Sequence, residues 1–138
     1  SKSMLKATVN KDVKIIEEIL HDIHNSEIPI LQYNDENSLS CVLTLAYLSA
    51  RDNYRVEREE KTGKGYADFT FHPRRKNDTA FIVELKKDEK PEIALKQIRS
   101  KEYVEKFKRE NMGKKILAVA ICYDSKEKEH HCLIEEID

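Results

Sequence analysis

The sequence predicts one α/β domain with a mixed central sheet flanked by helices. Three observations predict it: residues 10–51 carry apolar side chains at helical spacing, residues 54–86 alternate apolar and polar side chains, and residues 116–123 form a continuous apolar run. A further helical stretch separates the last two segments, which implies a parallel, right-handed β–α–β unit. The predicted element order within the 138 residues is therefore α-α-β-β-β-α-β.

Two helices are expected near the beginning of the chain. The first spans residues 10–24, with Asn10 as a suitable N-cap, and the segment around Pro29 ends it. The second spans residues 35–51 and is apolar almost all round, so we expect it to be buried.

Three short strands are expected next, at residues 54–59, 66–71 and 80–86. The turns between them, 61–65 and 73–78, are short, and this layout favours an antiparallel meander.

The last part of the chain completes the predicted unit. A helix is expected from Pro91 to about residue 111, where Gly113 follows it. Residues 116–123 then form a strand covered on both faces, and the tail at 131–137 suits an edge strand.

Composition excludes several classes of protein. Hydrophobic residues make up 39% of the chain and stand in periodic blocks, which is not typical of disorder. The net charge of −1 gives no global signature of a nucleic-acid binder, so any phosphate-binding surface must be local. The three cysteines form no CxxC pair, which indicates a reducing, cytoplasmic compartment. The longest apolar run is too short to span a bilayer, and the Ser-Lys-Ser-Met start is typical of a segment cut from a longer protein.

The most informative residues are Asp68, Glu84 and Lys86. Residues two apart on a strand project from the same face, so Glu84 and Lys86 lie side by side, roughly 7 Å apart along the strand. An acid and a base on an otherwise apolar strand are costly unless they are paired or bind a metal ion. If the two strands pair, Asp68 can lie near Glu84, although the sequence does not fix that register.

Two converging carboxylates would suit Mg²⁺ or Mn²⁺, which take oxygen ligands. Lys86 would then place positive charge beside an attacking water. A buried salt bridge without chemistry explains the same spacing, and spacing alone favours neither interpretation.

These residues resemble a known signature. The segment from Gly63 to Asp68, followed by Glu84-Leu85-Lys86, resembles the PD-(D/E)XK nuclease superfamily, with Ala67 where that signature has proline. More narrowly, the chain resembles the nuclease-like domain at the C-terminus of bacterial proteins that carry an N-terminal AAA-type ATPase-like domain. The residues that support this narrower resemblance are the Gly63-Lys64-Gly65 turn, Glu84-Leu85-Lys86, Ala94 to Ile98, Tyr103 and Ile121 to Tyr123.

The resemblance covers residues 33–125 as a core, with residues 1–30 as an added helical segment of the same domain. It implies a restriction-endonuclease-like fold and metal-dependent hydrolysis of phosphodiester bonds, above all in DNA. In that scheme Asp68, Glu84 and the carbonyl of Leu85 hold Mg²⁺ or Mn²⁺, and Lys86 orients and activates water.

Two further residues match the family only loosely. Glu36 shares a helical face with Leu39 and Leu43, and the resemblance implies that it adds to the metal site; stabilisation by the helix dipole explains it equally well. Gln97 lies on one stripe with Ile93, Ser100, Val104 and Phe107 and corresponds to a motif glutamine; a core amide bonded to neighbouring backbone is the alternative.

Other classes of function stay open. The same scaffold could be a non-catalytic binding or docking module of an ATPase-linked protein, or a structural domain with a buried Glu84–Lys86 pair. A homodimer is a further option, since cutting two strands often uses two sites. The histidines are weaker candidates for a metal site: we expect His21 and His24 to be exposed, and His130 and His131 to point to opposite faces of a strand.

Overall fold

The core of the fold is a five-stranded sheet with the strand order β1-β2-β3-β4-β5. The computed structural model describes residues 2–31, 36–60, 67–100 and 102–138. The strands are β1 (Tyr54–Glu60), β2 (Ala67–Pro73), β3 (Ala80–Lys87), β4 (Ile116–Asp124) and β5 (Glu129–Ile137). β3 and β4 are parallel, and all other neighbours are antiparallel. The predicted meander, the parallel unit and the C-terminal edge strand are therefore confirmed.

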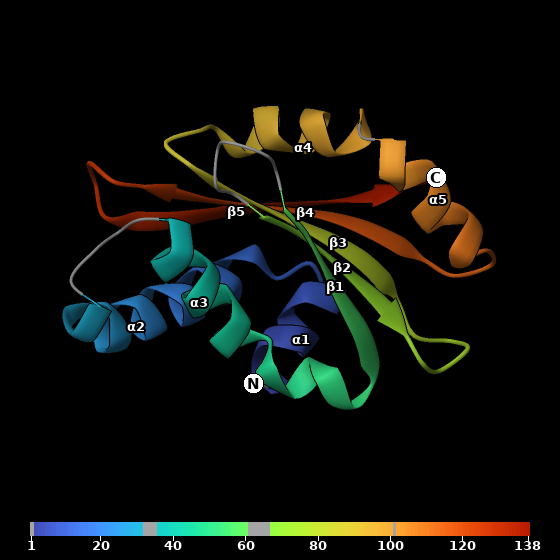
Figure 1. Cartoon of the computed structure of the whole chain (residues 1–138), viewed down its shortest axis with the longest axis horizontal. Helices are drawn as coiled ribbons and strands as arrows, with labels where there is room; N and C mark the ends of the chain where they lie inside the picture. Colours follow the sequence, from blue (N-terminus) through green and yellow to red (C-terminus); the bar gives the residue numbers. More distant parts are fainter. Residues whose placement is uncertain (1, 32–35, 61–66, 101) are drawn as a thin grey trace.

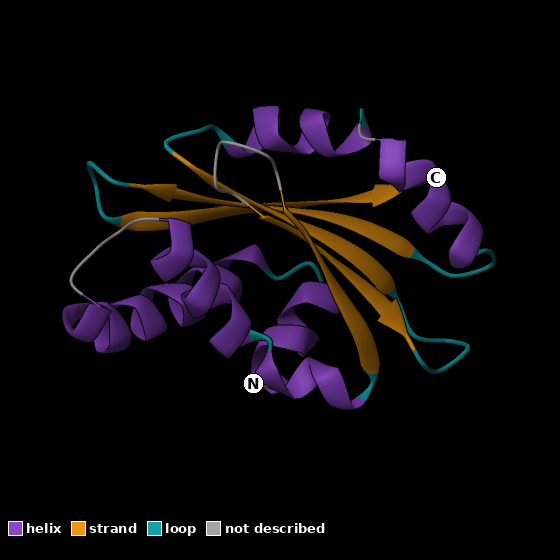
Figure 2. Cartoon of the chain, in the orientation of Figure 1, coloured by secondary structure: helices purple, strands orange, loops and turns teal. Residues whose placement is uncertain are grey.

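Helices cover both faces of this sheet, as Figures 1 and 2 show. The first group is α1 (Lys2–Val9), α2 (Val13–Leu31), α3 (Glu36–Ala46) and the short 3-10 helix η1 (Leu48–Asp52). The second group, α4 (Pro91–Arg99) and α5 (Glu102–Glu110), lies on the other face. The Gly63-Lys64-Gly65 turn lies outside the described residues.

Each face of the sheet carries its own apolar layer. On the α1–α3 side the rings of Phe71 and Phe81 stack with centroids 4.3 Å apart, and Tyr47 packs against both. On the α4–α5 side, Ile82 packs with Ala94 and Ile98 of α4. β4 is buried on both faces over Ile116 to Tyr123, which confirms the covered strand expected from its continuous apolar run.

The first predicted helix differs from the observed one at both ends. Asp12, not Asn10, caps α2: the Ile15 N–H donates to Asp12 Oδ1 over 3.4 Å, and Asn10 belongs to the preceding turn. The helix also continues through Pro29 to Leu31. Pro29 falls in the last turn of α2, where the loss of one backbone hydrogen bond is less disruptive than in the middle of a helix.

The single helix expected at residues 91–111 is wrong, because the chain forms α4 and α5 instead. Ser100 ends α4, and both its N–H and its hydroxyl donate to the carbonyl of Gln97. As a result the expected stripe from Ile93 to Phe107 is not continuous: Ile93 is 41% exposed, whereas Phe107 of α5 is buried.

The remaining expectations concern cysteines and membranes. Cys41, Cys122 and Cys132 are all free thiols. In the described part of the chain, no helix has the length and apolar character needed to cross a bilayer.

Candidate metal centre

The pairing of β2 with β3 sets the register that the sequence left open. Asp68 lies directly opposite Glu84 in this antiparallel pair. Directly opposed positions share one face of an antiparallel sheet, with Cβ atoms about 4.5–5.5 Å apart. Positions 68 and 84 are therefore neighbours on the α4–α5 side. The side chain of Asp68 lies outside the described part of the structure.

Glu84 is a fully buried carboxylate, with 0% of its surface exposed. The Nζ atom of Lys86 lies 3.8 Å from Glu84 Oε1, and the Lys86 side chain is 18% exposed. This separation brings opposite charges together but is longer than a charge-assisted hydrogen bond, which is about 2.7–2.9 Å. The acid and the base thus meet as expected, at a point where Lys86 reaches toward solvent.

Leu85 contributes its backbone, not its side chain, to this region. Its side chain is 1% exposed and packs in the apolar layer on the α1–α3 side. This follows from the alternation of a strand, because Leu85 lies between two residues that project to the opposite face.

Cys122 lies opposite Lys86 in the parallel β3–β4 pair. Burial raises the pKa of the Cys122 thiol to about 12, and the carboxylates of Glu89 and Glu84 add to the increase. The thiol is therefore protonated at neutral pH, whereas a metal ligand must be a thiolate. The donor set here is made of oxygens, which fits Mg²⁺ or Mn²⁺.

Two buried polar atoms on the same side of the sheet have no hydrogen-bond partner in the described part of the chain. Thr70, two residues after Asp68 on β2, is 3% exposed, and its Oγ1 is unpaired. Gln97 of α4 is half-buried, and its Oε1 is shielded from solvent and unpaired. Most buried polar atoms in proteins are paired, so such atoms call for an explanation. The core-amide alternative for Gln97, with its side chain bonded to nearby backbone, does not account for this oxygen.

Glu36 occupies a different position from the other candidates. It is the first residue of α3, and its helical stripe of Leu39, Leu43 and Tyr47 is buried as predicted. This helix covers the face opposite Glu84 (Figure 1). The side chain of Glu36 lies outside the described part of the structure.

His24 differs from the prediction, whereas His21 is exposed as expected. His24 is 7% exposed, not solvent-exposed, because its ring stacks on Tyr123 with centroids 4.7 Å apart. His130 packs against both rings, at 4.9 Å from Tyr123 and 5.4 Å from His24. Sequence periodicity missed this cluster because its members come from α2 and the β4–β5 hairpin.

A second group of ligand-type side chains lies at the β4–β5 hairpin. One ligand atom from each of Asp124, Glu127 and His131 falls within 4.8 Å of the others. Asp124 Oδ1 already accepts the N–H groups of Lys126 and Glu127, at 2.9 and 3.0 Å. These bonds explain the position of Asp124 by the turn itself, so we assign no ion to this group.

A separate cavity of about 380 Å³ lies between α1, η1 and the β2–β3 turn. Its lining includes Asp52, Asp78 and Thr79. Thr79 precedes β3, so this cavity lies toward the opposite end of that strand from Glu84. We therefore do not place the metal centre there.

Comparison with known proteins adds one match. The family model described as the PD-(D/E)XK nuclease superfamily matches residues 34–131. A search of curated proteins found no match. The matched region begins before α3, includes β1 to β4 in full and ends within the first residues of β5.

Proposed function

Because the chain belongs to the PD-(D/E)XK nuclease superfamily, we propose that it hydrolyses phosphodiester bonds with a divalent metal ion held at Asp68 and Glu84. The restriction-endonuclease-like α/β fold agrees with this membership. The observation that carries the proposal is the register of β2 and β3, which sets position 68 opposite the buried Glu84.

The proposed roles follow from the chemistry of each group. Asp68, Glu84 and the carbonyl of Leu85 hold Mg²⁺ or Mn²⁺, which lowers the pKa of bound water and stabilises negative charge on the phosphate. Lys86, next to Glu84, orients the attacking water through its ammonium group.

Gln97 and Glu36 have supporting roles in this scheme. The unpaired Gln97 Oε1 can accept a hydrogen bond from a water molecule. If the amide rotates, its NH₂ group can instead donate to a phosphate oxygen. Glu36 adds a carboxylate from the beginning of α3. Both roles are weaker than those of Asp68 and Glu84, since neither residue belongs to the paired strands.

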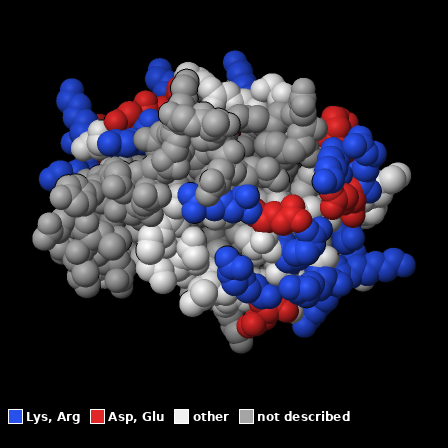
Figure 3. Space-filling view, in the orientation of Figure 1, with Lys and Arg blue, Asp and Glu red and all other residues white. Residues whose placement is uncertain are grey.

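The substrate we favour is DNA, in a cytoplasmic protein that also carries an ATPase-like domain. Figure 3 shows Lys and Arg side chains among Asp and Glu on the right-hand part of this face, and others along its upper left edge. Three exposed basic residues, Arg74, Arg75 and Lys76, follow β2 and form no ion pair with the described residues. Such residues can contact phosphates without reading sequence.

The direct test is cleavage of supercoiled, linear and single-stranded DNA with Mg²⁺ or Mn²⁺. Wild-type protein should nick or cut at least one substrate only when metal is present. Lys86→Ala and Glu84→Gln should lose this activity by roughly a hundredfold or more, as expected for removal of a group that stabilises the transition state. The matched control is Lys96→Ala, an exposed lysine on α4, which should keep full activity. Metal-dependent activity that persists in Glu84→Gln would overturn the proposed site.

A second function is supported by the complete burial of Glu84. A carboxylate that is 0% exposed and lies 3.8 Å from Lys86 also suits a structural ion pair in a non-catalytic docking module. That alternative predicts no cleavage and no detectable binding of Mn²⁺.

A further inference from the structure

The two edges of the sheet are protected to different degrees. At the β5 edge, the N–H of Cys132 donates to Glu17 Oε2 of α2 over 2.9 Å, so a helix side chain occupies an outward backbone group. At the other edge, none of the described strands or helices pairs with the outer side of β1, which is seven residues long. An open edge of this length is a template for pairing with another strand.

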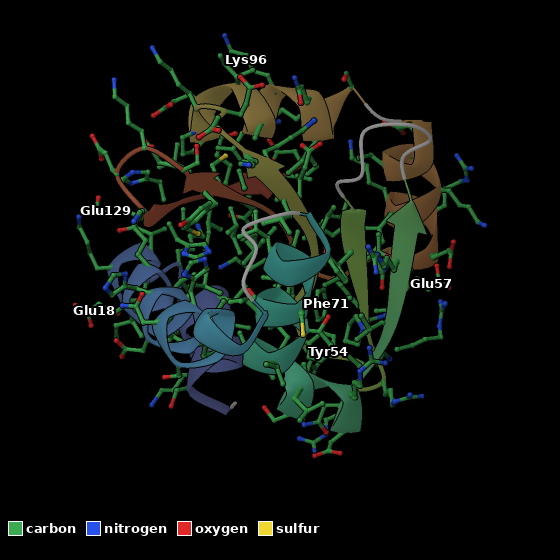
Figure 4. All side chains as sticks on the ribbon, turned by 60° about the vertical axis from the view of Figure 1, so that its left-hand side comes forward. Glu18, Tyr54, Glu57, Phe71, Lys96 and Glu129 are labelled. Carbon is green, nitrogen blue, oxygen red and sulfur yellow. The ribbon has the colours of Figure 1, made fainter. Side chains whose placement is uncertain are left out.

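The charges on β1 are arranged in a self-complementary order. Arg55 and Glu57 lie on one face, with side chains 48% and 46% exposed, and form an ion pair with each other. Arg55 also lies 3.4 Å from Glu110 of α5, and Glu57 lies 3.8 Å from His72 of β2. Figure 4 shows Glu57 on β1, the outermost strand of the sheet. Val56, between them, is half-buried and packs on the apolar layer of the α1–α3 side.

A two-fold axis perpendicular to the sheet would keep both faces continuous across a pair of β1 strands. With the axis at Val56, Arg55 of each copy lies opposite Glu57 of the other. With the axis at Arg55 or Glu57, two like charges would lie directly opposite each other, which is destabilising. The charge pattern therefore selects the register centred on Val56.

We propose that the protein forms a homodimer in which β1 pairs antiparallel with β1 of a second copy, centred on Val56. The two Val56 side chains meet on the α1–α3 side, and Arg55 and Glu57 form two symmetric ion pairs on the other side. Leu48 of η1, the helix that directly precedes β1, is 57% exposed.

The dimer would also determine how the two candidate metal centres face each other, and this consequence rests on the proposed nuclease function. Because the axis preserves the faces, the two candidate centres open on the same side of one ten-stranded sheet. Two sites on one side suit a substrate with two strands to cut.

The dimer itself is tested by mass, independently of activity. Sedimentation equilibrium of the wild-type protein should give twice the 16.2 kDa of one chain. Arg55→Glu and Glu57→Arg should each weaken association by roughly tenfold or more, because both symmetric pairs become repulsive. An equimolar mixture of the two variants should restore the dimer, since each variant then meets the opposite charge.

The control is Glu18→Arg, an exposed acid on α2 far from β1 in the fold, which should sediment like the wild type. Circular dichroism should show that every variant is folded. The inference is overturned if the wild type is monomeric throughout the micromolar range, if both single variants stay dimeric, or if mixing them does not restore association. A dimer without nuclease activity would leave this inference intact and contradict only the proposed function.

Discussion

Glu84 is a fully buried carboxylate, and the ammonium of Lys86 lies close to it. A carboxylate withdrawn from water needs opposite charge and hydrogen bonds close by. Lys86 Nζ lies 3.8 Å from Glu84 Oε1. In the proposed metal centre, a divalent ion bound between positions 68 and 84 would bring further positive charge to this carboxylate.

Replacing Lys86 therefore distinguishes a metal ligand from a structural pair. Lys86→Met should lower the free energy of unfolding by about 1–3 kcal/mol, because Glu84 stays buried with less compensation. Mn²⁺ should restore part of this loss, since a ligand that binds only the folded state stabilises it. Urea unfolding at neutral pH with and without Mn²⁺ measures both effects.

The control for this measurement is Lys96→Met, which changes an exposed lysine on α4. Because Lys96→Met keeps the proposed metal site, Mn²⁺ should stabilise it as well. If Mn²⁺ stabilises neither Lys86→Met nor this control, Glu84 is not a metal ligand.

At the scale of elements, α2 packs against the β4–β5 hairpin through contacts between aromatic and histidine rings. His24 of α2 lies on Tyr123, and His130 closes the cluster from β5. Figure 4 shows Glu18 of α2 and Glu129 of β5 on the same side of the molecule, where both line a hollow beside His130. Burial lowers the pKa of His130 from its ordinary 6.5 to about 3, and the nearby His24, His21 and His131 add to the decrease.

This cluster predicts a loss of stability in acid. The folded protein keeps His130 neutral, whereas the unfolded chain takes up a proton below pH 6.5. The contribution to stability is therefore fully present above pH 6.5 and falls by about 1.4 kcal/mol per pH unit below it, until about pH 3. His130→Phe should flatten this slope. Urea unfolding measures it between about pH 7.5 and pH 4.5, a range in which an ordinary histidine titrates.

His131→Asn, at a half-buried position next to His130, is the control. Because His131 contributes least to the lowered pKa of His130, this variant should change the slope less than His130→Phe does. An unchanged slope in His130→Phe would show that other groups cause the acid sensitivity.

The elements also show where local patterns are sufficient. The alternation predicted over residues 54–86 holds along β2, where Phe69 and Phe71 lie in one apolar layer and Thr70 lies on the other face. The break at Ser100 could not be predicted in this way, because apolar spacing continues across it and the break depends on hydrogen bonds to Gln97.

For the whole molecule, the sequence predicted the order of strands but not the contacts between distant segments. Motif spacing identified Asp68, Glu84 and Lys86, and the pairing of β2 with β3 was needed to set their register. His24 was expected to be exposed because its partner Tyr123 belongs to a distant strand. Burial of a polar residue by a remote element leaves no periodic signal in its own helix.

The most direct measurement is anomalous diffraction from crystals soaked in Mn²⁺. We expect one Mn²⁺ peak between Asp68 and Glu84, within coordination distance of an oxygen of each carboxylate. No peak there, or a peak only at Asp124, Glu127 and His131 of the hairpin, would contradict the proposed metal centre.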